Sequence, residues 1–484
     1  MQRLRSITPA VLMNVNNHLQ RYRRCMTLAA VVVSAFVFSS CSFLSLFHEQ
    51  DDFIRVQGIY LMHQGRPYYF AGSNLWYGCY LGSPGRTGDR QRLVRELDSL
   101  SAYGITNLRL LAASEDSYIR RSIKPALQTA AGVCDDSMLV GLDFLMSEIA
   151  KRNMHAVLYL NNYWDWSGGM AQYVVWATGV EGADPDDPQK GYGRFMDFSA
   201  SFYSTPKAMD LYDQYIRMLI TRTNTINGRK YSEDPSIMSW QLANEPRPGR
   251  DGDAGKKNLP EFYEWINRTA KSIHDLDTNH LVSTGSEGKV GCIQMEDVFL
   301  ESHKSPSIDY LTFHLWPLNW GWFNPNRISE TLPSTEKKAL EYLSLHLALA
   351  RTLHKPIVME EFGIGRDSAA FLPGTPTSAR DHYFKLLFSA IYDSARNGAP
   401  IAGSNFWAWG GEGRARHSDG VWKIGDPCVG DPPQEPQGRN SIFLNDYSTM
   451  EIIRDHARKM EKMVILDSAG IAAQEAGMKE LLQR

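Results

Sequence analysis

The sequence has few of the features that mark a metal centre or a nucleic-acid partner. Its 484 residues include six cysteines, which form no CxxC pair and no Cys/His cluster with the spacing of zinc ligands. The 13 histidines contain no HExxH motif. The formal net charge of −3 gives no excess charge to attract nucleic acid or anionic lipid. We therefore expect no metal, no other cofactor, and a neutral or small substrate.

Internal repeats and low-complexity linkers are also missing, which argues against an array of small domains. A chain of this length can hold two or three average domains, but a single α/β barrel often extends over about 250 residues or more. We predict that residues 51–484 form one catalytic domain, and we expect a monomer.

The first 50 residues have the pattern of an export signal. Basic residues at 21–24 precede an apolar run at 26–38, which is followed by Ser39-Ser40-Cys41. This arrangement is typical of a secretory signal, and the apolar run is too short for an ordinary membrane-spanning helix. The junction resembles that of a bacterial lipoprotein. We expect an exported, cell-envelope protein whose one membrane contact is a lipid anchor at Cys41, or else a soluble secreted form cleaved nearby.

Four cysteines remain after this leader: Cys79, Cys134, Cys292 and Cys428. An oxidising compartment permits one or two disulfides among them, but the sequence does not pair them. Aromatic residues are plentiful, with 12 Trp and 22 Tyr. Most are expected in the core, although sugars stack on such rings and an aromatic-lined cleft is therefore of interest.

Short apolar runs alternate with amphipathic stretches along the rest of the chain. Near-continuous hydrophobic runs are expected of parallel strands that are covered on both faces. We predict eight strands, at Tyr68–Trp76, Ile105–Leu111, His155–Asn161, Ile237–Asn244, His280–Gly285, Tyr310–Trp316, Pro356–Glu361 and Gly403–Trp409. Helices are predicted at Arg90–Tyr103, Leu139–Asn153, Ala208–Asn224, Pro260–Asp275, Thr335–Leu353 and Ser378–Asn397. Eight repeats favour an α/β fold of the (β/α)8 TIM barrel type over a doubly wound open sheet.

Most of these strands end in polar or aromatic residues, as an active site at the carboxyl ends of barrel strands requires. The ring comprises Ser73-Asn74, Trp76, Arg109, Asn161-Asn162, Asn244-Glu245, Ser286-Glu287, His314, Glu360-Glu361 and Trp407. Two long loops, Tyr163–Pro206 after strand three and Gly410–Asn440 after strand eight, are predicted on the same face. The first is rich in aromatic residues and is expected to wall the cleft. Ser448-Thr449-Met450-Glu451 predicts a capping box that opens a helix through Met463.

Glu245 and Glu361 are the candidate catalytic residues. Each ends a hydrophobic strand, the predicted fourth and seventh, so the two can face each other across the barrel mouth. Glycoside cleavage needs a proton donor for the leaving group and a negative charge opposite the developing oxocarbenium ion. Retaining enzymes place two carboxyl groups about 5–5.5 Å apart for this purpose. One such Glu alone is more often an ion-pair partner or helix cap, whereas two in these positions favour catalysis.

The chain resembles glycoside hydrolase family 5, and more narrowly its endo-β-1,4-mannanase subfamily. The matching stretches occur in the right order over about residues 53 to 463. They are residues 69–76 (YFAGSNLW), 107–109 (NLR), 161–169 (NNYWDWSGG), 242–247 (LANEPR), 283–288 (STGSEG), 313–317 (FHLWP), 360–363 (EEFG) and 406–410 (FWAWG).

This resemblance implies a role for each matching residue. Glu245 would be the general acid/base and Glu361 the nucleophile, with Asn244 on the substrate 2-hydroxyl. Arg109 would hold Glu361 ionised by lowering its pKa. Glu245 would need a raised pKa, from partial burial and the nearby negative charge. Because alternate strand residues point to opposite sides, only one of the adjacent Glu360 and Glu361 can face the sugar.

The resemblance further implies substrate contacts from His314, from Trp407 as a platform under the sugar, and from Glu287, Trp76 and Trp164. Many family members carry Tyr where this chain has Trp316, so the contact that the hydroxyl makes with the nucleophile would fall to an indole N–H. The alternative for Arg109 is an ion pair alone, for His314 a buried core histidine, and for the tryptophans plain packing.

The leading functional hypothesis is retaining hydrolysis of internal β-1,4-mannosidic bonds in mannan, glucomannan or galactomannan. The preference for mannan rests on the resemblance, because the residues alone indicate only a β-glycoside. Rivals are an exo-acting β-mannosidase or mannobiose-releasing enzyme, an endo-β-1,4-glucanase on the same scaffold, and a glycan-binding lipoprotein without catalysis. Both glutamates being present disfavours the last of these.

Overall fold

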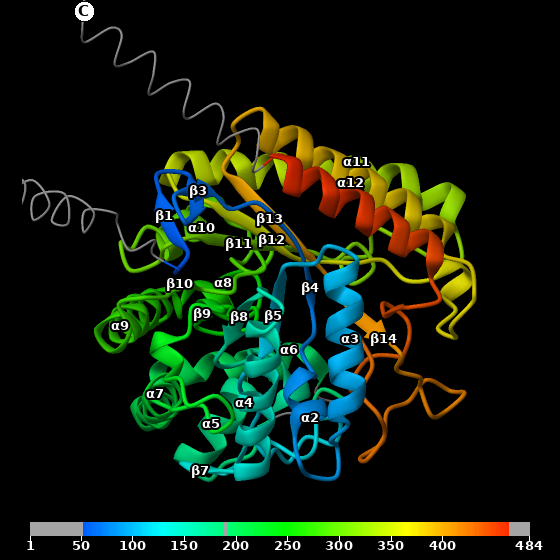
Figure 1. Ribbon diagram of the computed structural model, residues 1–484. Coiled ribbons are helices and arrows are strands. Elements are labelled where there is room, and N and C mark those ends of the chain that lie inside the picture. Colours follow the sequence, from blue (N-terminus) through cyan, green and yellow to red (C-terminus); the bar gives the residue numbers. More distant parts are fainter. Residues whose placement is uncertain (1–51, 183, 188–190, 464–484) are drawn as a thin grey trace, which may run out of the picture. The chain divides into compact units, whose positions relative to one another are not determined.

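The computed structural model describes residues 52–182, 184–187 and 191–463. They form a (β/α)8 barrel (Figure 1). Its parallel strands are β4 (Phe70–Asn74), β5 (Asn107–Leu111), β8 (His155–Tyr159), β9 (Ile237–Gln241), β10 (Leu281–Ser283), β11 (Leu311–Leu315), β12 (Ile357–Phe362) and β13 (Ile401–Phe406). Every residue of these strands is buried, as expected where helices cover the outer face of the sheet and side chains fill its interior.

The sheet closes on itself between its first and last members. Its hydrogen-bonded order is β10-β9-β8-β5-β4-β13-β12-β11. Backbone hydrogen bonds from Asp309 N–H to the Val282 carbonyl oxygen (2.8 Å) and from His314 N–H to the Glu287 carbonyl oxygen (3.2 Å) join the β10 and β11 segments. The carboxyl ends of all the strands therefore meet at one rim.

Helices cover the outside of the barrel. They are α3 (Arg90–Ala102), α4 (Asp136–Ala150), α7 (Pro206–Ile220), α9 (Leu259–Leu276), α10 (Glu296–His303), α11 (Ile328–Leu353), α12 (Ser378–Arg396) and a last helix at residues 447–463. In α9 the buried residues Phe262, Trp265, Ile266, Thr269, Ala270 and Ile273 recur every three or four positions, so a single face packs on the sheet.

A small antiparallel sheet covers the amino ends of the strands. It consists of β1 (Arg55–Gln57), β2 (Tyr60–His63) and β3 (Arg66–Pro67). Ile54 and Leu61 from this region pack on residues at or near the starts of the barrel strands, namely Phe70, Val157, Met238, Leu281, Val358 and Ala402. This apolar layer seals the lower end of the barrel and leaves the carboxyl-end rim for chemistry.

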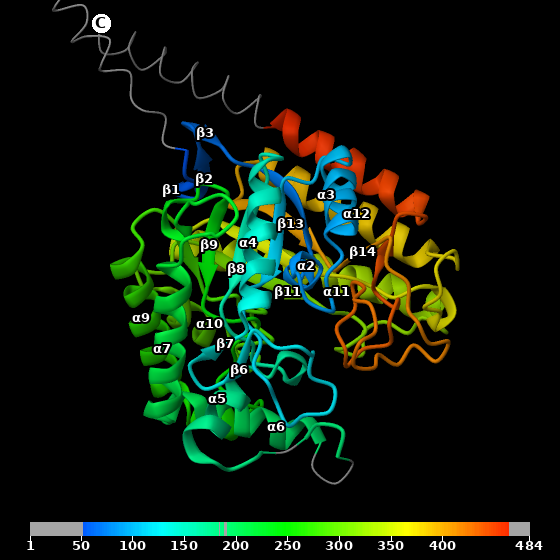
Figure 2. The same ribbon diagram turned by 60° about the horizontal axis from the view of Figure 1, so that its bottom comes forward.

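Shorter elements lie mainly in the connections. They are α2 (Gly78–Gly82), β6 (Gln128–Ala130), β7 (Val133–Cys134), α5 (Gly169–Thr178), α6 (Gly191–Ala200), α8 (Asp253–Lys256), β14 (Trp409–Gly411) and β15 (Ile442–Phe443), with 3-10 turns at Asp165–Ser167, Ser201–Ser204, Tyr231–Glu233 and Asp367–Ala369. Figure 2 shows α5 and α6 beside the β6–β7 hairpin. A buried hydrogen bond of 2.6 Å from Gln128 to the Tyr173 hydroxyl joins the hairpin to α5.

All eight predicted strands are confirmed, although most are shorter than predicted. Three local predictions are wrong. The segment predicted as a long loop at Tyr163–Pro206 contains α5 and α6. Both helices begin with glycine, a poor helix former, so their starts do not indicate a helix. Helix α11 begins at Ile328, so Pro333 lies inside it as its sixth residue, where a proline removes one backbone hydrogen bond but does not end the helix. Ser448 lies inside the last helix rather than at its cap, since the helix already begins at residue 447.

The four cysteines of the described part are free thiols, so none of the permitted disulfides forms among them. The predicted leader and Cys41 lie outside the described residues. Within the described ranges, no helix is both long and apolar enough to cross a membrane.

Buried polar contacts hold the predicted loop at Gly410–Asn440 in place. The Asp431 carboxylate accepts hydrogen bonds from the backbone N–H groups of Gly438 (2.8 Å), Asn440 (2.8 Å) and Ser441 (3.1 Å). Beside it, Arg366 donates to Asp446 at 2.9 Å, and both side chains are almost fully buried. The loop that follows β13 is therefore a fixed part of the rim.

We predict that Asp446→Ala lowers the free energy of unfolding by about 3–5 kcal/mol, because it leaves the Arg366 guanidinium buried without its partner. Urea denaturation measures this loss. Asp275→Ala is the matched control, since its partner Lys271 and the aspartate are both mostly exposed, and its loss should stay below about 1 kcal/mol. Equal losses in the two variants would contradict the prediction.

Candidate active site

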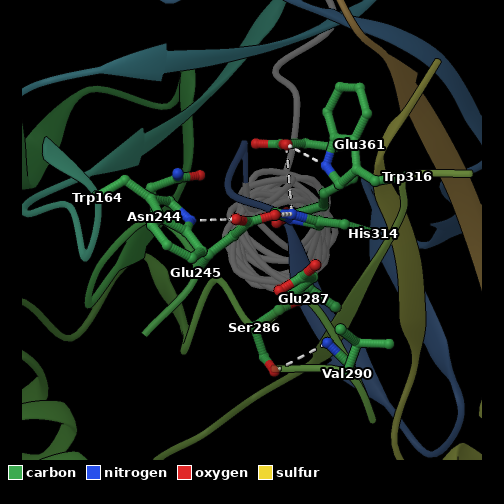
Figure 3. A network of polar contacts seen from close by, with 12 residues as sticks. Trp164, Asn244, Glu245, Ser286, Glu287, Val290, His314, Trp316 and Glu361 are labelled. Atoms are coloured by element: carbon green, nitrogen blue, oxygen red, sulfur yellow. Dashed lines mark hydrogen bonds and ion pairs between the residues drawn. The ribbon is translucent and has the colours of Figure 1, made fainter. Parts of the chain in front are cut away.

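Glu245 and Glu361 face each other at the rim of the barrel (Figure 3). Glu245 follows β9, and Glu361 is the fifth residue of β12. One oxygen of each carboxyl group and one ring nitrogen of His314 all lie within 4.8 Å of one another. The side chains are 8% and 3% exposed, so both carboxyls are buried yet reach the cleft. The two carboxyl groups are therefore near enough to act together on one glycosidic bond, for which retaining enzymes use a spacing of about 5–5.5 Å.

Arg109 lies under this pair and contacts the nucleophile candidate directly. Its Nη1 donates to the Glu361 carboxylate, and its Nη2 donates to the Asn244 side-chain oxygen at 2.8 Å. Arg109 is fully buried, with its guanidinium 4.5 Å from the centre of the Tyr159 ring. The predicted contact between Arg109 and Glu361 is therefore present, from the middle of β5 to the end of β12.

His314 connects the two glutamates. Its Nδ1 lies 2.6 Å from one Glu245 oxygen and 3.4 Å from one Glu361 oxygen. Burial, followed by the positive charge of Arg109, lowers the pKa of His314 well below its ordinary value, so the ring is neutral. A neutral imidazole carries one N–H and can share a single proton with Glu245 without adding charge to the site.

Two indole N–H groups complete the contacts of the pair. Trp164 donates to Glu245, on the oxygen that His314 does not contact. Trp316 donates to Glu361 at 3.2 Å, so its indole N–H makes the contact that the resemblance assigned to this position. Each carboxyl group thus has a hydrogen-bonding partner on each of its two oxygens.

Burial raises the pKa of both carboxyls. For Glu361, Arg109 opposes this rise, whereas negative charge on Glu245 and on Glu360 adds to it. Arg109 therefore lowers the pKa of Glu361, as predicted, but burial raises that pKa by more. Glu361 is ionised most easily when its two neighbouring carboxyls carry protons, which is the state that a general acid at Glu245 requires.

The backbone at Glu245 has an unusual conformation. Its φ of 50° lies in the left-handed region, which non-glycine residues adopt at a cost of about 1–3 kcal/mol. The Glu245 N–H donates to the Gly285 carbonyl oxygen at 2.9 Å, and the preceding Asn244 N–H donates to the Asn161 carbonyl oxygen at 2.8 Å. These bonds to both neighbouring strand ends hold the turn that directs the Glu245 side chain toward Glu361.

The pair opens into a cleft of about 680 Å³, a size suited to a small chain of sugars. Trp164, Asn244, Glu287, Trp316 and Trp407 line it, as the sequence predicts. The Asn244 amide has two N–H groups. Among the described residues one of them donates to Asn162 at 3.1 Å, which leaves the other for a ligand. Trp316 and Trp407 form an edge-to-face pair with ring centres 5.7 Å apart.

Glu287 is held at one end of this cleft. Arg247 donates to one of its oxygens and Trp320 to the other, at 3.0 Å. Neither partner was assigned a role from the sequence. Arg247 directly follows Asn-Glu-Pro, a motif predicted at the rim, and this position in the sequence indicates that its side chain lies near the site.

Trp76 does not line the cleft. Its ring is 1% exposed and packs against Tyr77, Tyr80 and Trp166, and its N–H donates to the Gly430 carbonyl oxygen at 2.8 Å. The strand predicted through Trp76 ends at Asn74, and the chain then turns into α2. Trp76 supports the loop after β13 from below.

The far wall of the cleft comes from the two long connections. Asp165, Trp166, Tyr192 and Met196 line it from the segment after β8, and Pro432, Gln434, Glu435, Pro436 and Arg439 from the loop after β13. Asp165 is 3% exposed, one of its oxygens has no partner among the described residues, and burial raises its pKa to about 7. Sequence reasoning placed both segments at the rim, but no short motif singled out these side chains.

Glu245, His314 and Glu361 could also be considered as a set of metal ligands, because their donor atoms are close together. Arg109 is in contact with Glu361, and its positive charge would compete with any cation there. Both carboxyls also already accept hydrogen bonds from Arg109, Trp164 or Trp316. The arrangement therefore suits an acid/base and nucleophile pair better than a metal centre.

Comparisons with known proteins agree with this site. A model of the GH family 5 beta-mannosidase-like family matches residues 51–464. Putative mannan endo-1,4-beta-mannosidase 4 of Arabidopsis thaliana is 29% identical over 428 residues, covering 85% of this chain and 91% of that protein. Mannan endo-1,4-beta-mannosidase 7 of the same plant is 30% identical over 371 residues, covering 73% and 77%.

Among solved structures, the glycoside hydrolase family 5 mannosidase of Rhizomucor miehei is 36% identical with a TM-score of 0.78, covering 86% of this chain and 99% of that one. The family model covers most of the chain, and both the barrel and the two strand-end glutamates are in place. The protein is thus a glycoside hydrolase that belongs to the β-mannosidase-like group of family 5.

Proposed function

We propose that this enzyme hydrolyses internal β-1,4-mannosidic linkages of mannan-type polysaccharides with retention of anomeric configuration. The observation that supports it most directly is the pair Glu245 and Glu361, close together in one cleft, with a guanidinium in direct contact with Glu361 but not with Glu245. Such a pair provides one carboxyl that stays charged and one that can carry a proton, as double displacement requires.

In the first step, the protonated Glu245 donates its proton to the glycosidic oxygen while the Glu361 carboxylate attacks the anomeric carbon. The bond to the leaving sugar breaks and a glycosyl ester of Glu361 forms. In the second step, Glu245, now a carboxylate, takes a proton from water, and that water attacks the same carbon and releases Glu361. The Trp164 N–H stabilises the Glu245 carboxylate between the two steps.

The choice of mannan follows the similarity to relatives that include mannan endo-1,4-beta-mannosidases from plants. The cleft suits a neutral polysaccharide. Trp407 and Trp316 offer ring faces and edges to a sugar, and Asn244 offers an amide N–H close to Glu245 for its 2-hydroxyl. We assign a further polar contact with the sugar to Glu287, which lines the cleft. Arg109 and His314, which the resemblance implied as substrate contacts, are fully buried and act through Glu361 and Glu245 instead.

One observation favours an exo-acting β-mannosidase as a second candidate. Arg121 donates from Nη1 to the Gln434 carbonyl oxygen at 2.9 Å and from Nε to Asp186 at 2.6 Å. It therefore fastens the loop after β13 to the segment after β8, and side chains from both line the same wall. A cleft closed at that wall would release mannose or mannobiose from chain ends. The solved mannosidase of Rhizomucor miehei is also more similar to this chain in sequence than the plant mannanases.

We also propose that the enzyme is exported, with Cys41 as a lipid-anchored first residue. The pattern of residues 21–41 supports this, and substrate polymers of this class lie outside the cytoplasm. A monomer remains our expectation.

Product analysis tests the reaction and its mode. Wild-type enzyme should release mixed oligosaccharides from linear mannan and little from cellulose derivatives, with retained configuration by NMR. Glu361→Ala and Glu245→Ala should each lower kcat by several orders of magnitude, because each removes one of the two reacting carboxyls. Mannose or mannobiose alone from the outset would favour the exo enzyme. Release from cellulose instead would favour a glucanase, and no release from either polymer would favour a binding protein.

Trp316→Phe tests the indole that takes the place of tyrosine. We expect kcat/KM to fall about tenfold to a hundredfold, because a hydrogen bond to a charged group contributes about 1.5–3 kcal/mol. Loss of the donor destabilises the Glu361 carboxylate and raises its pKa, so the acidic limb of the pH profile should move up by about one unit. Trp422→Phe is the control, since that buried indole N–H has no partner within the described ranges. An unmoved acidic limb in Trp316→Phe would count against the assignment.

Arg121→Ala separates the two modes of attack. If the Arg121 contacts close the cleft, the variant should release a larger share of products longer than mannobiose. If the cleft is open, as the endo mode requires, the product pattern should not change. Chromatography of products at low conversion measures the share, and Lys271→Ala is the control because its salt bridge is exposed on α9.

A further inference from the structure

Glu360 is a third buried carboxyl in the catalytic centre, and neither step of the reaction uses it. It directly precedes Glu361 in β12 and is 1% exposed. The register of β12 against β11 shifts at this point, with Met359 opposite Phe313 and Glu361 opposite His314. Glu360 is the extra residue of this irregularity, so the usual alternation of strand side chains is broken there. As a result, both Glu360 and Glu361 come within ion-pair distance of Arg109, while only Glu361 lines the cleft.

The hydrogen bonds of Arg109 are directed away from Glu360. Its Nη1 binds Glu361 and the Asn74 side-chain oxygen, and its Nη2 binds Asn244. Its Nε donates to the Gln241 side-chain oxygen at 2.9 Å, although Glu360 lies only 3.4 Å from the same nitrogen. Glu360 thus lies beside the guanidinium without accepting a hydrogen bond from it.

The other contacts of Glu360 are too few for a buried anion. Oε2 accepts one N–H, from Gln241 at 2.5 Å. Oε1 contacts the Tyr310 hydroxyl at 3.3 Å, and that hydroxyl lies much closer to Ser239 Oγ, at 2.7 Å. A buried carboxylate normally accepts several hydrogen bonds, because isolating the charge from water is costly. A carboxylic acid needs only one acceptor for its O–H, and Tyr310 is placed to be that acceptor.

We propose that Glu360 is a positioning residue held as a neutral carboxylic acid, whose Oε1–H donates to Tyr310 while Tyr310 donates to Ser239, so that the charge of Arg109 is left to Glu361. The proposal rests on the role of Glu361 as nucleophile. Glu360 also fixes the orientation of Gln241. The Gln241 amide donates to the unprotonated Glu360 oxygen and to Ser283 Oγ at 2.9 Å, and its side-chain oxygen accepts from Arg109.

A count of charges in the centre agrees with this state. The titratable or charged groups that face Glu360 are Arg109 from β5, Tyr310 just before β11 and Glu361 beside it; β9 presents Ser239 and Gln241, and β4 contacts only its backbone oxygen through Asn74. Burial raises the pKa of Glu360 and raises that of Tyr310 well above its ordinary value. With Glu245 protonated for catalysis, a neutral Glu360 leaves one carboxylate against one guanidinium, so the buried centre carries no net charge.

The first test is infrared spectroscopy of the folded enzyme at neutral pH, which needs no activity. Wild type should show the carbonyl stretch of a protonated carboxyl that disappears in Glu360→Gln. Tyr310→Phe should shift the frequency of the same band, because it removes the acceptor of the O–H. A spectrum of protonated carboxyls unchanged in Glu360→Gln, or unshifted in Tyr310→Phe, overturns the proposal. Because the measurement does not depend on turnover, an inactive enzyme would refute the proposed reaction without deciding this point.

The second test compares pH profiles. Glu360→Gln keeps the shape and the neutral charge of the proposed acid, so the acidic limb of the kcat/KM profile should stay at the wild-type pH. If Glu360 were ionised, the substitution would remove a negative charge next to Glu361. The pKa of Glu361 would then fall, and the acidic limb would move to lower pH by about one to two units. Such a shift overturns the proposal.

Glu360→Leu separates positioning from the mere presence of the side chain. It leaves the Gln241 amide and, through it, the Arg109 Nε contact unsupported, so kcat should fall about tenfold or more with a smaller change in KM. Recovery of the wild-type profile in Glu360→Gln, with thermal unfolding measured on both variants, shows that hydrogen bonding rather than charge is needed. Equal loss in the Gln and Leu variants of unchanged stability overturns the positioning role.

Discussion

The Arg109 guanidinium is taken completely out of water, and the catalytic centre is organised by the way its charge is compensated. An uncompensated buried cation costs several kcal/mol, so its nitrogens need acceptors. Each of the three nitrogens has at least one, and the acceptors are Asn74 in β4, Gln241 in β9, Asn244 after β9 and Glu361 in β12. One rigid, planar group therefore sets the orientation of the nucleophile, of the asparagine beside the acid/base, and of the glutamine below them.

The two reacting carboxyls are equally buried, yet their surroundings make them chemically different. Glu361 contacts a permanent cation, whereas Glu245 contacts a neutral histidine and an indole. The contact with Arg109 thus favours negative charge on Glu361 and leaves the shared proton to Glu245 when the pair acts. Environment, rather than residue type, divides the roles between two glutamates.

The fold and the catalytic pair were accessible from the sequence because both depend on strands. A parallel strand buried on both faces is a continuous apolar run, and its last residue necessarily lies at the rim, so Glu245 and Glu361 could be placed together before any coordinates. Trp76 shows where this reasoning stops. Its strand ends two residues earlier than predicted. The ring turns into the core, and its N–H donates to the carbonyl oxygen of Gly430, which is 354 residues away in sequence. Nor could Glu360 be placed, because alternation along the strand fails at the irregularity in β12.

The catalytic pair and the far wall of the cleft are built by different parts of this chain. The contact between Arg109 and Glu361 follows from the barrel itself, since the hydrogen-bonded order of the strands places the end of β12 across from β5 in any chain with these motifs. The contact between Arg121 and Gln434 follows from two connections that the strands do not constrain. A relative can therefore share the chemistry of this enzyme through its strands and still differ in whether it attacks a polymer from within or from its end. If the exo proposal holds, the loops after β8 and β13, and the arginine that joins them, are where substitutions would change the mode of attack while leaving the reaction itself intact.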